Sequence, residues 1–93
     1  MTVRLSLIQA RAYFVIRDHG PLGPSQIGQR LGFEYERASA SVTRPLRKLV
    51  KFGLCVKTAK NERVVKYSVR TDVPPPMIIE TTEEDVVLLK RMG

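Results

Sequence analysis

The spacing of apolar residues changes at Phe52-Gly53, and this change constrains the fold more than any other feature of the sequence. Before it, apolar residues recur every three or four positions, which is the period of one face of an α-helix. After it, they alternate with polar residues, which is the period of a β-strand. The sequence therefore predicts an α+β domain in which helices come first and a β-hairpin follows.

Two helices are predicted in the first third of the chain. The first covers residues 6–19 and ends at Gly20-Pro21, where glycine can adopt the left-handed conformation and proline cannot continue the helix. The second begins at Pro24-Ser25, with Ser25 as its capping residue, and ends at Gly32. The residues expected to face the core are Leu5, Ile8, Ala12 and Val15 for the first helix, and Ile27 and Leu31 for the second.

A third helix is predicted to end at Phe52-Gly53, but Pro45 leaves its start open. Proline inside a helix removes a backbone hydrogen bond and costs about 3 kcal/mol, whereas in a first turn the missing donor is harmless. Either the helix begins near Thr43, whose hydroxyl would cap it, or an earlier turn at residues 36–41 is kinked at Pro45. Its expected apolar face is Ala38, Val42, Leu46 and Leu49.

The hairpin is predicted from two alternating stretches on either side of residues 59–63, which contain no apolar residue larger than alanine. We expect this tip to be exposed and basic. In the first strand, Leu54, Val56 and Thr58 share one face and Cys55 and Lys57 the other; in the second, Val65, Tyr67 and Val69 lie opposite Val64, Lys66 and Ser68.

The charge is divided along the chain. Residues 1–70 hold 14 basic and 4 acidic residues, a net +10, and residues 71–93 hold 2 basic and 5 acidic residues, a net −3. The three prolines Pro74, Pro75 and Pro76 stand near this change and favour an extended polyproline segment. We therefore assign residues 1–72 to a folded body and residues 73–93 to a proline linker and a short acidic C-terminal helix.

The residue types that carry enzyme chemistry are scarce. One cysteine, Cys55, and one histidine, His19, cannot complete a four-ligand zinc site, and one cysteine cannot close an internal disulfide. The four acids of the body are dispersed, and no catalytic or phosphate-loop motif occurs. We expect no enzymatic activity, no cofactor and no metal. Because no apolar run is long enough for a signal or spanning helix, we expect a cytoplasmic protein with no membrane partner, nucleoid-associated in a prokaryote or in the host cytoplasm if phage-encoded.

The order helix, short helix, third helix and basic hairpin resembles a winged helix-turn-helix domain. Residues 20–32, residues 41–54 and the hairpin are similar to helix 2, the recognition helix and the wing of MarR-like and related small prokaryotic or phage regulators. The resemblance implies sequence-specific binding of double-stranded DNA by a transcriptional regulator. Because a body of this size reads only a short site, we expect it to act as a homodimer on a palindrome. The chain departs from this family in two places: residues 33–41 are longer than the usual turn of three to four residues, and Pro45 stands where the family has a helix former.

The third helix is also suited to DNA on physical grounds, because base edges offer hydrogen-bonding groups and the flanking phosphates offer charge. Arg44 is the best candidate for a bidentate contact with guanine, worth about 1–3 kcal/mol of discrimination. We predict base contacts from Arg37, Ser41, Thr43 and Arg44, and phosphate contacts from Arg47, Lys48 and Lys51. Further DNA contacts are predicted from Ser25 in the second helix and from Lys57, Lys60, Arg63 and Lys66 in the hairpin.

Other interpretations remain open at this point. Ser41 and Thr43 equally suit helix capping, and isolated surface Lys and Arg residues usually only interact with solvent. The alternative function is a winged-helix module that binds an acidic protein surface as an adaptor, assembly or inhibitor component; a third is RNA or architectural DNA binding. For a homodimer, we expect the first helix or residues 86–92 to supply the contacts.

Overall fold

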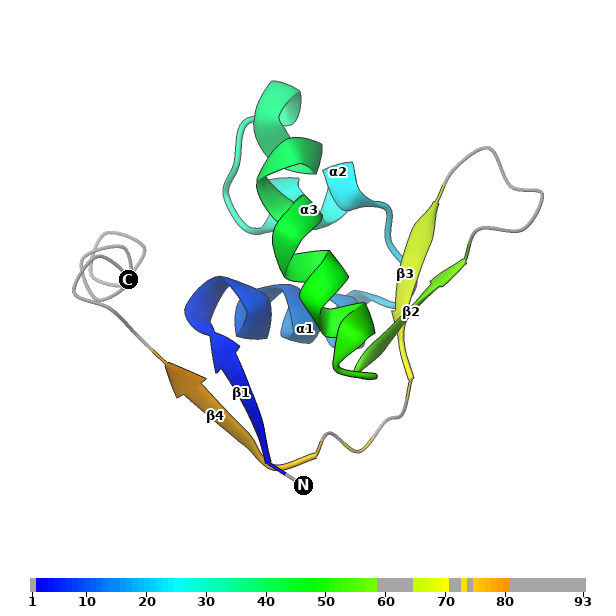
Figure 1. Cartoon of the computed structure of the whole chain (residues 1–93). Coiled ribbons are helices and arrows are strands. Elements are labelled where there is room, and N and C mark those ends of the chain that lie inside the picture. The colour runs from blue at the N-terminus through cyan, green and yellow to red at the C-terminus, as the bar shows by residue number, and fades with distance from the viewer. Residues whose placement is uncertain (1, 59–64, 71–72, 74, 81–93) are drawn as a thin grey trace.

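The structure, a computed structural model, describes residues 2–58, 65–70, 73 and 75–80. Within them it has three helices followed by a β-hairpin, and a second small sheet at the other end of the molecule (Figure 1). The α+β prediction is confirmed, and the layout is consistent with a winged helix. The elements are β1 (Val3–Ser6), α1 (Leu7–His19), α2 (Pro24–Arg30), α3 (Tyr35–Lys51), β2 (Cys55–Thr58), β3 (Lys66–Val69) and β4 (Met77–Glu80).

The first helix ends where predicted and begins one residue later than predicted, with Ser6 as its N-cap. The Ser6 hydroxyl accepts the Gln9 N–H at 3.3 Å, and the Gln9 side-chain oxygen accepts the Ser6 N–H at 3.0 Å. This reciprocal cap satisfies two of the donors that a helix start leaves open. Gly20 ends α1 at a φ of 78°, in the region that glycine enters without strain.

The second helix starts at a different cap from the one predicted. Gly23 is its N-cap and Pro24 its first residue, so Ser25 lies inside the first turn and the prediction that it caps the helix is wrong. Proline suits this position because its missing N–H would have no partner there. The Ser25 hydroxyl instead accepts a hydrogen bond from Gln29 Nε2 at 3.2 Å.

The third helix continues through Pro45. It begins at Tyr35, so the interpretation that placed its start near Thr43 is wrong. The helical residues that the other interpretation placed before Pro45 are confirmed, while the kink at Pro45 stays a prediction. Thr43 does not cap the helix either; its Oγ1 donates to the Ser39 carbonyl at 3.0 Å. The buried residues of α3 are Ala38, Val42, Pro45, Leu46 and Leu49.

The connection between α2 and α3 is short. It consists of residues 31–34, so the long gap expected over residues 33–41 is wrong, because most of those residues belong to α3. Gly32 turns the chain at a φ of 97°, and the Phe33 N–H donates to the Gly28 carbonyl at 3.0 Å. Four residues with a glycine is the usual connection of a helix-turn-helix.

The hairpin packs its inner face on the helices. Cys55 pairs with Val69 and Lys57 with Tyr67, so these four side chains share one face. The grouping within each strand is the one that the alternation predicted, and the register adds which faces of the two strands coincide. The α1–α2 connection joins the sheet at Leu22, whose N–H and C=O bond the Tyr67 backbone at 3.1 and 2.8 Å. The hairpin is therefore held by the core and by a third segment of chain.

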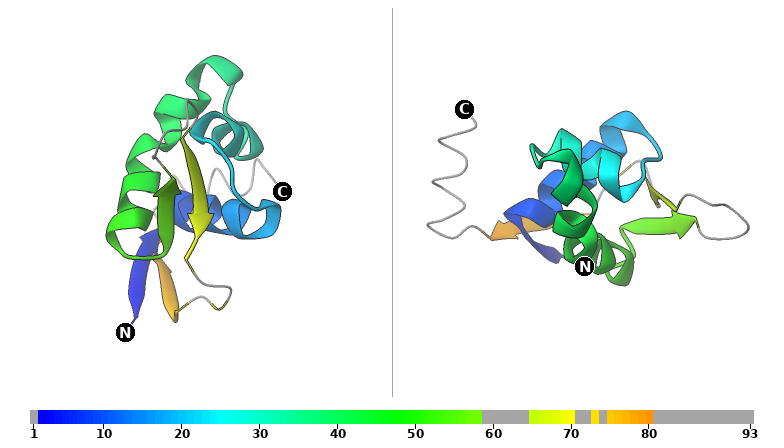
Figure 2. Two further views of the ribbon diagram at one scale, coloured as in Figure 1. Left: turned by 90° about the vertical axis from the view of Figure 1, so that its right-hand side faces the viewer. Right: turned by 90° about the horizontal axis from the view of Figure 1, so that it is seen from above.

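The sheet formed by β1 and β4 was not predicted. The two strands run parallel, with Val3 opposite Met77 and Leu5 opposite Ile79. Leu5, expected on the apolar face of the first helix, lies in β1 and is fully buried. Figure 1 and the right view of Figure 2 place this sheet and the hairpin at opposite ends of the molecule, with α3 between them. The predicted hairpin tip and C-terminal helix lie outside the described residues.

Candidate functional site

One face of α3 carries four exposed cationic side chains: Arg37, Arg44, Lys48 and Lys51. We call these residues the basic face. Arg37, Arg44 and Lys51 are seven residues apart and Lys48 follows Arg44 by four, so all four project to the same side, away from the buried residues of α3. From residue 37 to residue 51 the helix rises about 21 Å at about 1.5 Å per residue.

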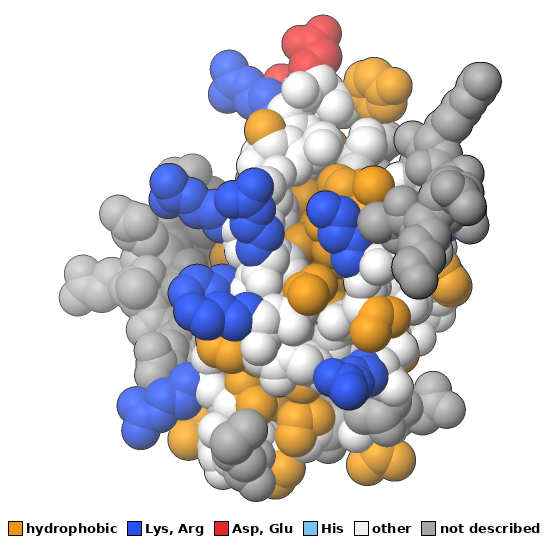
Figure 3. Space-filling view, turned by 45° about the vertical axis from the view of Figure 1, so that its right-hand side comes forward, with side chains coloured by type: hydrophobic (Ala, Val, Ile, Leu, Met, Phe, Trp, Pro, Cys, Tyr) orange, Lys and Arg blue, Asp and Glu red, His pale blue; other side chains and the backbone are white. Residues whose placement is uncertain are grey.

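The basic face is not neutralised by the described part of the chain. None of its four side chains forms an ion pair with a described carboxylate. The one acidic residue of α3, Glu36, lies in its first turn, where a negative charge suits the helix dipole. Figure 3 shows Lys and Arg side chains following one another down this side of the molecule, with the visible acidic side chains confined to its upper end.

Arg47 lies on the flank of α3 that meets the hairpin. Burial raises the pKa of Tyr67 in β3, and the positive charge of Arg47 acts against that rise, which places the two side chains within electrostatic reach. Lys57 is exposed, and it projects from the same hairpin face as its cross-strand neighbour Tyr67. Arg47 and Lys57 therefore extend the cationic surface from α3 toward the hairpin.

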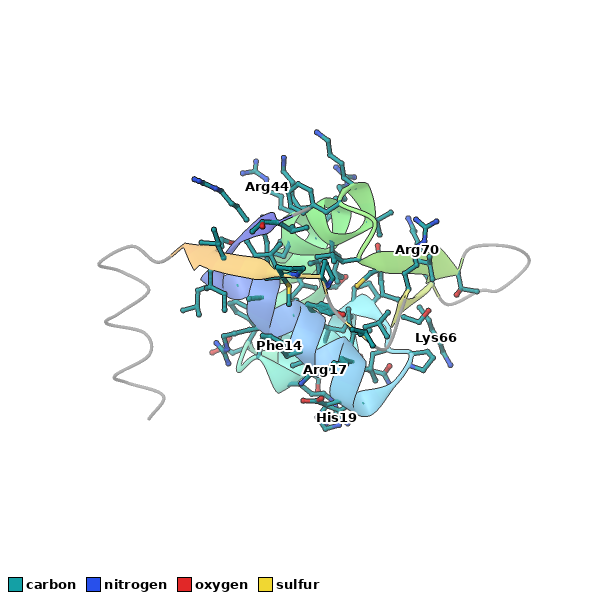
Figure 4. All side chains as sticks on the ribbon, turned by 90° about the horizontal axis from the view of Figure 1, so that it is seen from below. Phe14, Arg17, His19, Arg44, Lys66 and Arg70 are labelled. Carbon is teal, nitrogen blue, oxygen red and sulfur yellow. The ribbon has the colours of Figure 1, made fainter. Side chains whose placement is uncertain are left out.

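Lys66 lies on the other face of the hairpin. It pairs with Thr58, one position along from the pair of Lys57 and Tyr67, so its side chain projects the opposite way. In Figure 4 Lys66 lies on the side of the hairpin away from Arg44. The structure therefore brings Lys57, but not Lys66, toward the surface of α3.

Arg70 belongs to this surface and was missed in the sequence. Its guanidinium lies beside Gly53, where a Cβ would stand 3.6 Å from Nη1, and its backbone N–H donates to the Leu54 carbonyl at 2.9 Å. It thus adds a positive charge just beyond the C-terminal end of α3, beside Gly53, which follows Lys51 by two residues. Only the hairpin register, which places Arg70 opposite Leu54, identifies it, and the sequence pattern does not give that register.

The polar residues predicted to contact DNA are placed less favourably. Ser41 is half-buried, seven residues before Lys48, at the margin of the basic face. Thr43 is exposed, but its hydroxyl already donates to the backbone of its own helix. Ser25, on α2, is half-buried with its hydroxyl engaged by Gln29. Lys60 and Arg63 lie outside the described residues.

The far side of the molecule holds a different charge arrangement. Figure 4 places Phe14, Arg17 and His19 of α1 on the side opposite Arg44. Arg17 stacks over the Phe14 ring at 4.7 Å, and its Nε pairs with Asp18 at 3.1 Å. The positive charge of Arg17 is thus matched locally, which makes this side a natural reference for charge changes on α3.

Cys55 is part of the core. It is 2% exposed, and burial raises the pKa of its thiol from 9.0 to about 11, so it stays neutral near pH 7. Within the described ranges, no group of three or more His, Cys, Asp and Glu residues is gathered as a metal site would require, and no helix is long and apolar enough to cross a membrane.

The chain was compared with models of known protein families, with curated proteins and with solved structures, and no match was found. An exposed helix whose cationic face is unpaired with any described carboxylate, beside a hairpin that adds further cations, can bind an elongated polyanion.

Proposed function

We propose that this chain binds double-stranded DNA as a small winged helix-turn-helix regulator, with α3 in the major groove and the β2–β3 hairpin as the wing. The observation that carries the proposal is the basic face of α3, which is exposed along about four helical turns and unpaired with any described carboxylate. The major groove is about 12 Å wide and accepts one α-helix.

The position of each cation supports a division of roles. Arg44 stands in the middle of the basic face, where a helix comes closest to the floor of the groove, and it is our candidate for reading guanine. Arg37 lies in the N-terminal part of α3, where base contacts concentrate in this motif. We assign phosphate contacts to the cations toward the C-terminal end of α3, which are Lys48, Lys51 and Arg70. We assign contacts with the DNA backbone beside the hairpin to Arg47 and Lys57.

A single copy would read only a short site. One basic face spans about 21 Å, which is about six base-pair steps of 3.4 Å. We therefore propose that the protein acts as a homodimer on a palindromic site, because two half-sites multiply the specificity that one helix supplies.

The test compares one charge reversal on the basic face with the same change on the far side. Fluorescence anisotropy with a random-sequence duplex at about 50 mM salt measures binding, and about six phosphate contacts per copy give a slope of log affinity against log salt of about −5. Arg44→Glu should weaken binding by at least about tenfold, and Arg17→Glu by less than about threefold. Thermal unfolding of both variants controls for the fold.

Two outcomes would contradict the proposal. If Arg44→Glu and Arg17→Glu weaken binding equally, the basic face has no special role. If the unmodified protein binds no duplex even at about 50 mM salt, the alternative of an acidic protein partner is favoured. If the unmodified protein does bind duplexes, selection of bound fragments from a random duplex library identifies the DNA sequence it prefers and the spacing of the half-sites.

A further inference from the structure

The outer edge of β4 is open in the described structure. Each strand of a two-stranded sheet has one edge that its neighbour does not cover, and among the described residues β1 is the only strand that pairs with β4. Ile78 and Ile79, on this strand, are 47% and 43% exposed. Open, apolar edges of this kind are templates for pairing with another chain. We propose that β4 pairs antiparallel with β4 of a second copy of this chain, forming a continuous four-stranded sheet in the order β1-β4-β4-β1.

The backbone directions of β4 fit this pairing. The Val3 N–H donates to the Pro76 carbonyl at 3.0 Å, so the Pro76 carbonyl points toward β1. Because the polar groups of successive strand residues point to alternate edges, those of Ile78 also point toward β1. The N–H and C=O groups of Met77 and Ile79 therefore point to the open edge.

A two-fold axis perpendicular to the sheet selects the register. Such an axis relates two antiparallel strands and keeps the two faces of the sheet distinct. Each β4 residue must therefore lie opposite a β4 residue of the second copy whose side chain is on the same face of the sheet. With the axis at Ile78, Met77 of each copy opposes Ile79 of the other. In an antiparallel sheet, a hydrogen-bonded pair of opposed residues exchanges two backbone hydrogen bonds. The two Met77–Ile79 pairs across the axis therefore form four bonds, which use every N–H and C=O of Met77 and Ile79 that points to the open edge.

The same register matches the side chains. On the outer face, Ile78 lies beside Ile78 of the second copy. On the inner face, which holds the buried Leu5, Met77 lies beside Ile79 of the second copy. All of these contacts are apolar, and such cross-strand pairs stabilise a sheet. The register that satisfies the backbone is thus also the one that covers the exposed isoleucines.

This interface leaves the proposed DNA surface free. The β1–β4 sheet and the hairpin lie at opposite ends of the molecule with α3 between them, so a dimer joined at β4 exposes both basic faces (Figures 1 and 2). A single short edge is smaller than the about 1,200 Å² buried by most stable interfaces, so we expect a weak, concentration-dependent dimer. The role of this dimer in binding a palindrome rests on the proposed function. Two half-sites on one duplex would strengthen the dimer, because they hold the two copies at a high effective concentration.

The first experiment measures the dimer of the full chain without DNA, by sedimentation velocity from about 1 μM to about 1 mM. Ile79→Pro removes an N–H that points to the open edge and leaves the groups that bond β1, since proline is tolerated on such edges. Ile79→Thr is the matched control, because it changes the same side chain and keeps the N–H. We expect Ile79→Pro to weaken association by at least about tenfold relative to Ile79→Thr. Equal association of the two variants would contradict the proposed bonding.

The second experiment tests the register directly. Ile78 faces itself across the axis, so Ile78→Lys or Ile78→Glu alone should abolish the dimer by opposing like charges, and an equimolar mixture of the two should restore it. Val56→Lys, an equally exposed valine in the hairpin, adds the same charge as a control and should leave association unchanged. A mixture that associates no better than either variant alone would overturn the register.

The outcomes separate this inference from the proposed function. A protein that remains monomeric up to about 1 mM, while binding duplexes with one half-site, would overturn the β4 interface and leave DNA binding intact. A protein that dimerises through β4 and binds no duplex would do the reverse. If Ile79→Pro lowers the melting temperature, the mixture of Ile78→Lys and Ile78→Glu tests the β4 interface instead, because these two substitutions keep every backbone N–H.

Discussion

The described part of the chain contains two sheets, each of two four-residue strands, and the two sheets differ in strand direction and in how far apart in sequence their strands lie. The hairpin is antiparallel, joins neighbouring segments, and gains Leu22 as a third segment. The β1–β4 sheet is parallel and joins residues near the two ends of the described chain. The comparison shows that a local sequence pattern is enough to specify the hairpin, whereas the β1–β4 sheet is specified only by contacts within the folded protein.

The largest expected effect tests whether β1 belongs to the core as fully as the hairpin does. Leu5 in β1 and Tyr67 in β3 are both buried. We expect Leu5→Ala and Tyr67→Ala each to lower the free energy of unfolding by about 2–5 kcal/mol, because each leaves a cavity. Urea denaturation measures both. If Leu5→Ala costs less than about 1 kcal/mol, β1 is a peripheral ribbon rather than part of the body.

The hairpin could be predicted because its signals are local. Alternating residues and a polar tip specify two adjacent strands, and the capping residues Ser6 and Gln9 specify the start of α1 in the same way. In contrast, Arg4 and Ser6 of β1 alternate with apolar residues over too few positions to be distinguished from a helix start. The β1–β4 pairing depends on contacts far apart in sequence, which no local pattern reports.

Pro45 shows how burial can override a local rule. Its cost of about 3 kcal/mol inside a helix favours a helix start near Thr43 as one of two interpretations, yet α3 has more than two turns before Pro45. Ala38 and Val42, both fully buried, lie in those turns, and burying one valine contributes about 1.5–3 kcal/mol. A Cβ on Gly28 would overlap the Ala38 carbonyl, so α2 packs directly against this part of α3 and holds it helical.

The candidate site was predicted as far as helix periodicity reaches. The spacing of Arg44, Lys48 and Lys51 places them on one face without further information. The faces of the hairpin lysines needed the position of the core: only the burial of Cys55 and Tyr67 identifies the inner face, and hence the different directions of Lys57 and Lys66. Arg70 needed the same register, which joins it to Leu54 at the end of α3.

A medium effect distinguishes the two sheets by pH, because the hairpin buries the ionisable thiol of Cys55. The folded-state pKa of about 11 lies above the ordinary 9.0, so the folded protein holds its proton more tightly than the unfolded chain does. Stability should be constant, as far as this group is concerned, below pH 9 and should fall by about 2 kcal/mol as the pH rises through 11. Urea denaturation of Cys55→Ala between pH 8 and 11 should lack this decrease. An identical decrease in the variant would assign it to other groups.

The smallest expected effect tests the two faces of the hairpin. Lys57 and Lys66 are both exposed lysines on adjacent strands, and they differ mainly in the face from which they project. On the proposed function, Lys57→Ala should weaken duplex binding by about threefold to tenfold and reduce the salt slope by about 1, while Lys66→Ala should change neither. Anisotropy titrations at several salt concentrations measure both quantities. A larger loss from Lys66→Ala would mean that the hairpin meets DNA with its outer face, so that α3 and the hairpin could not contact the duplex in the arrangement proposed here.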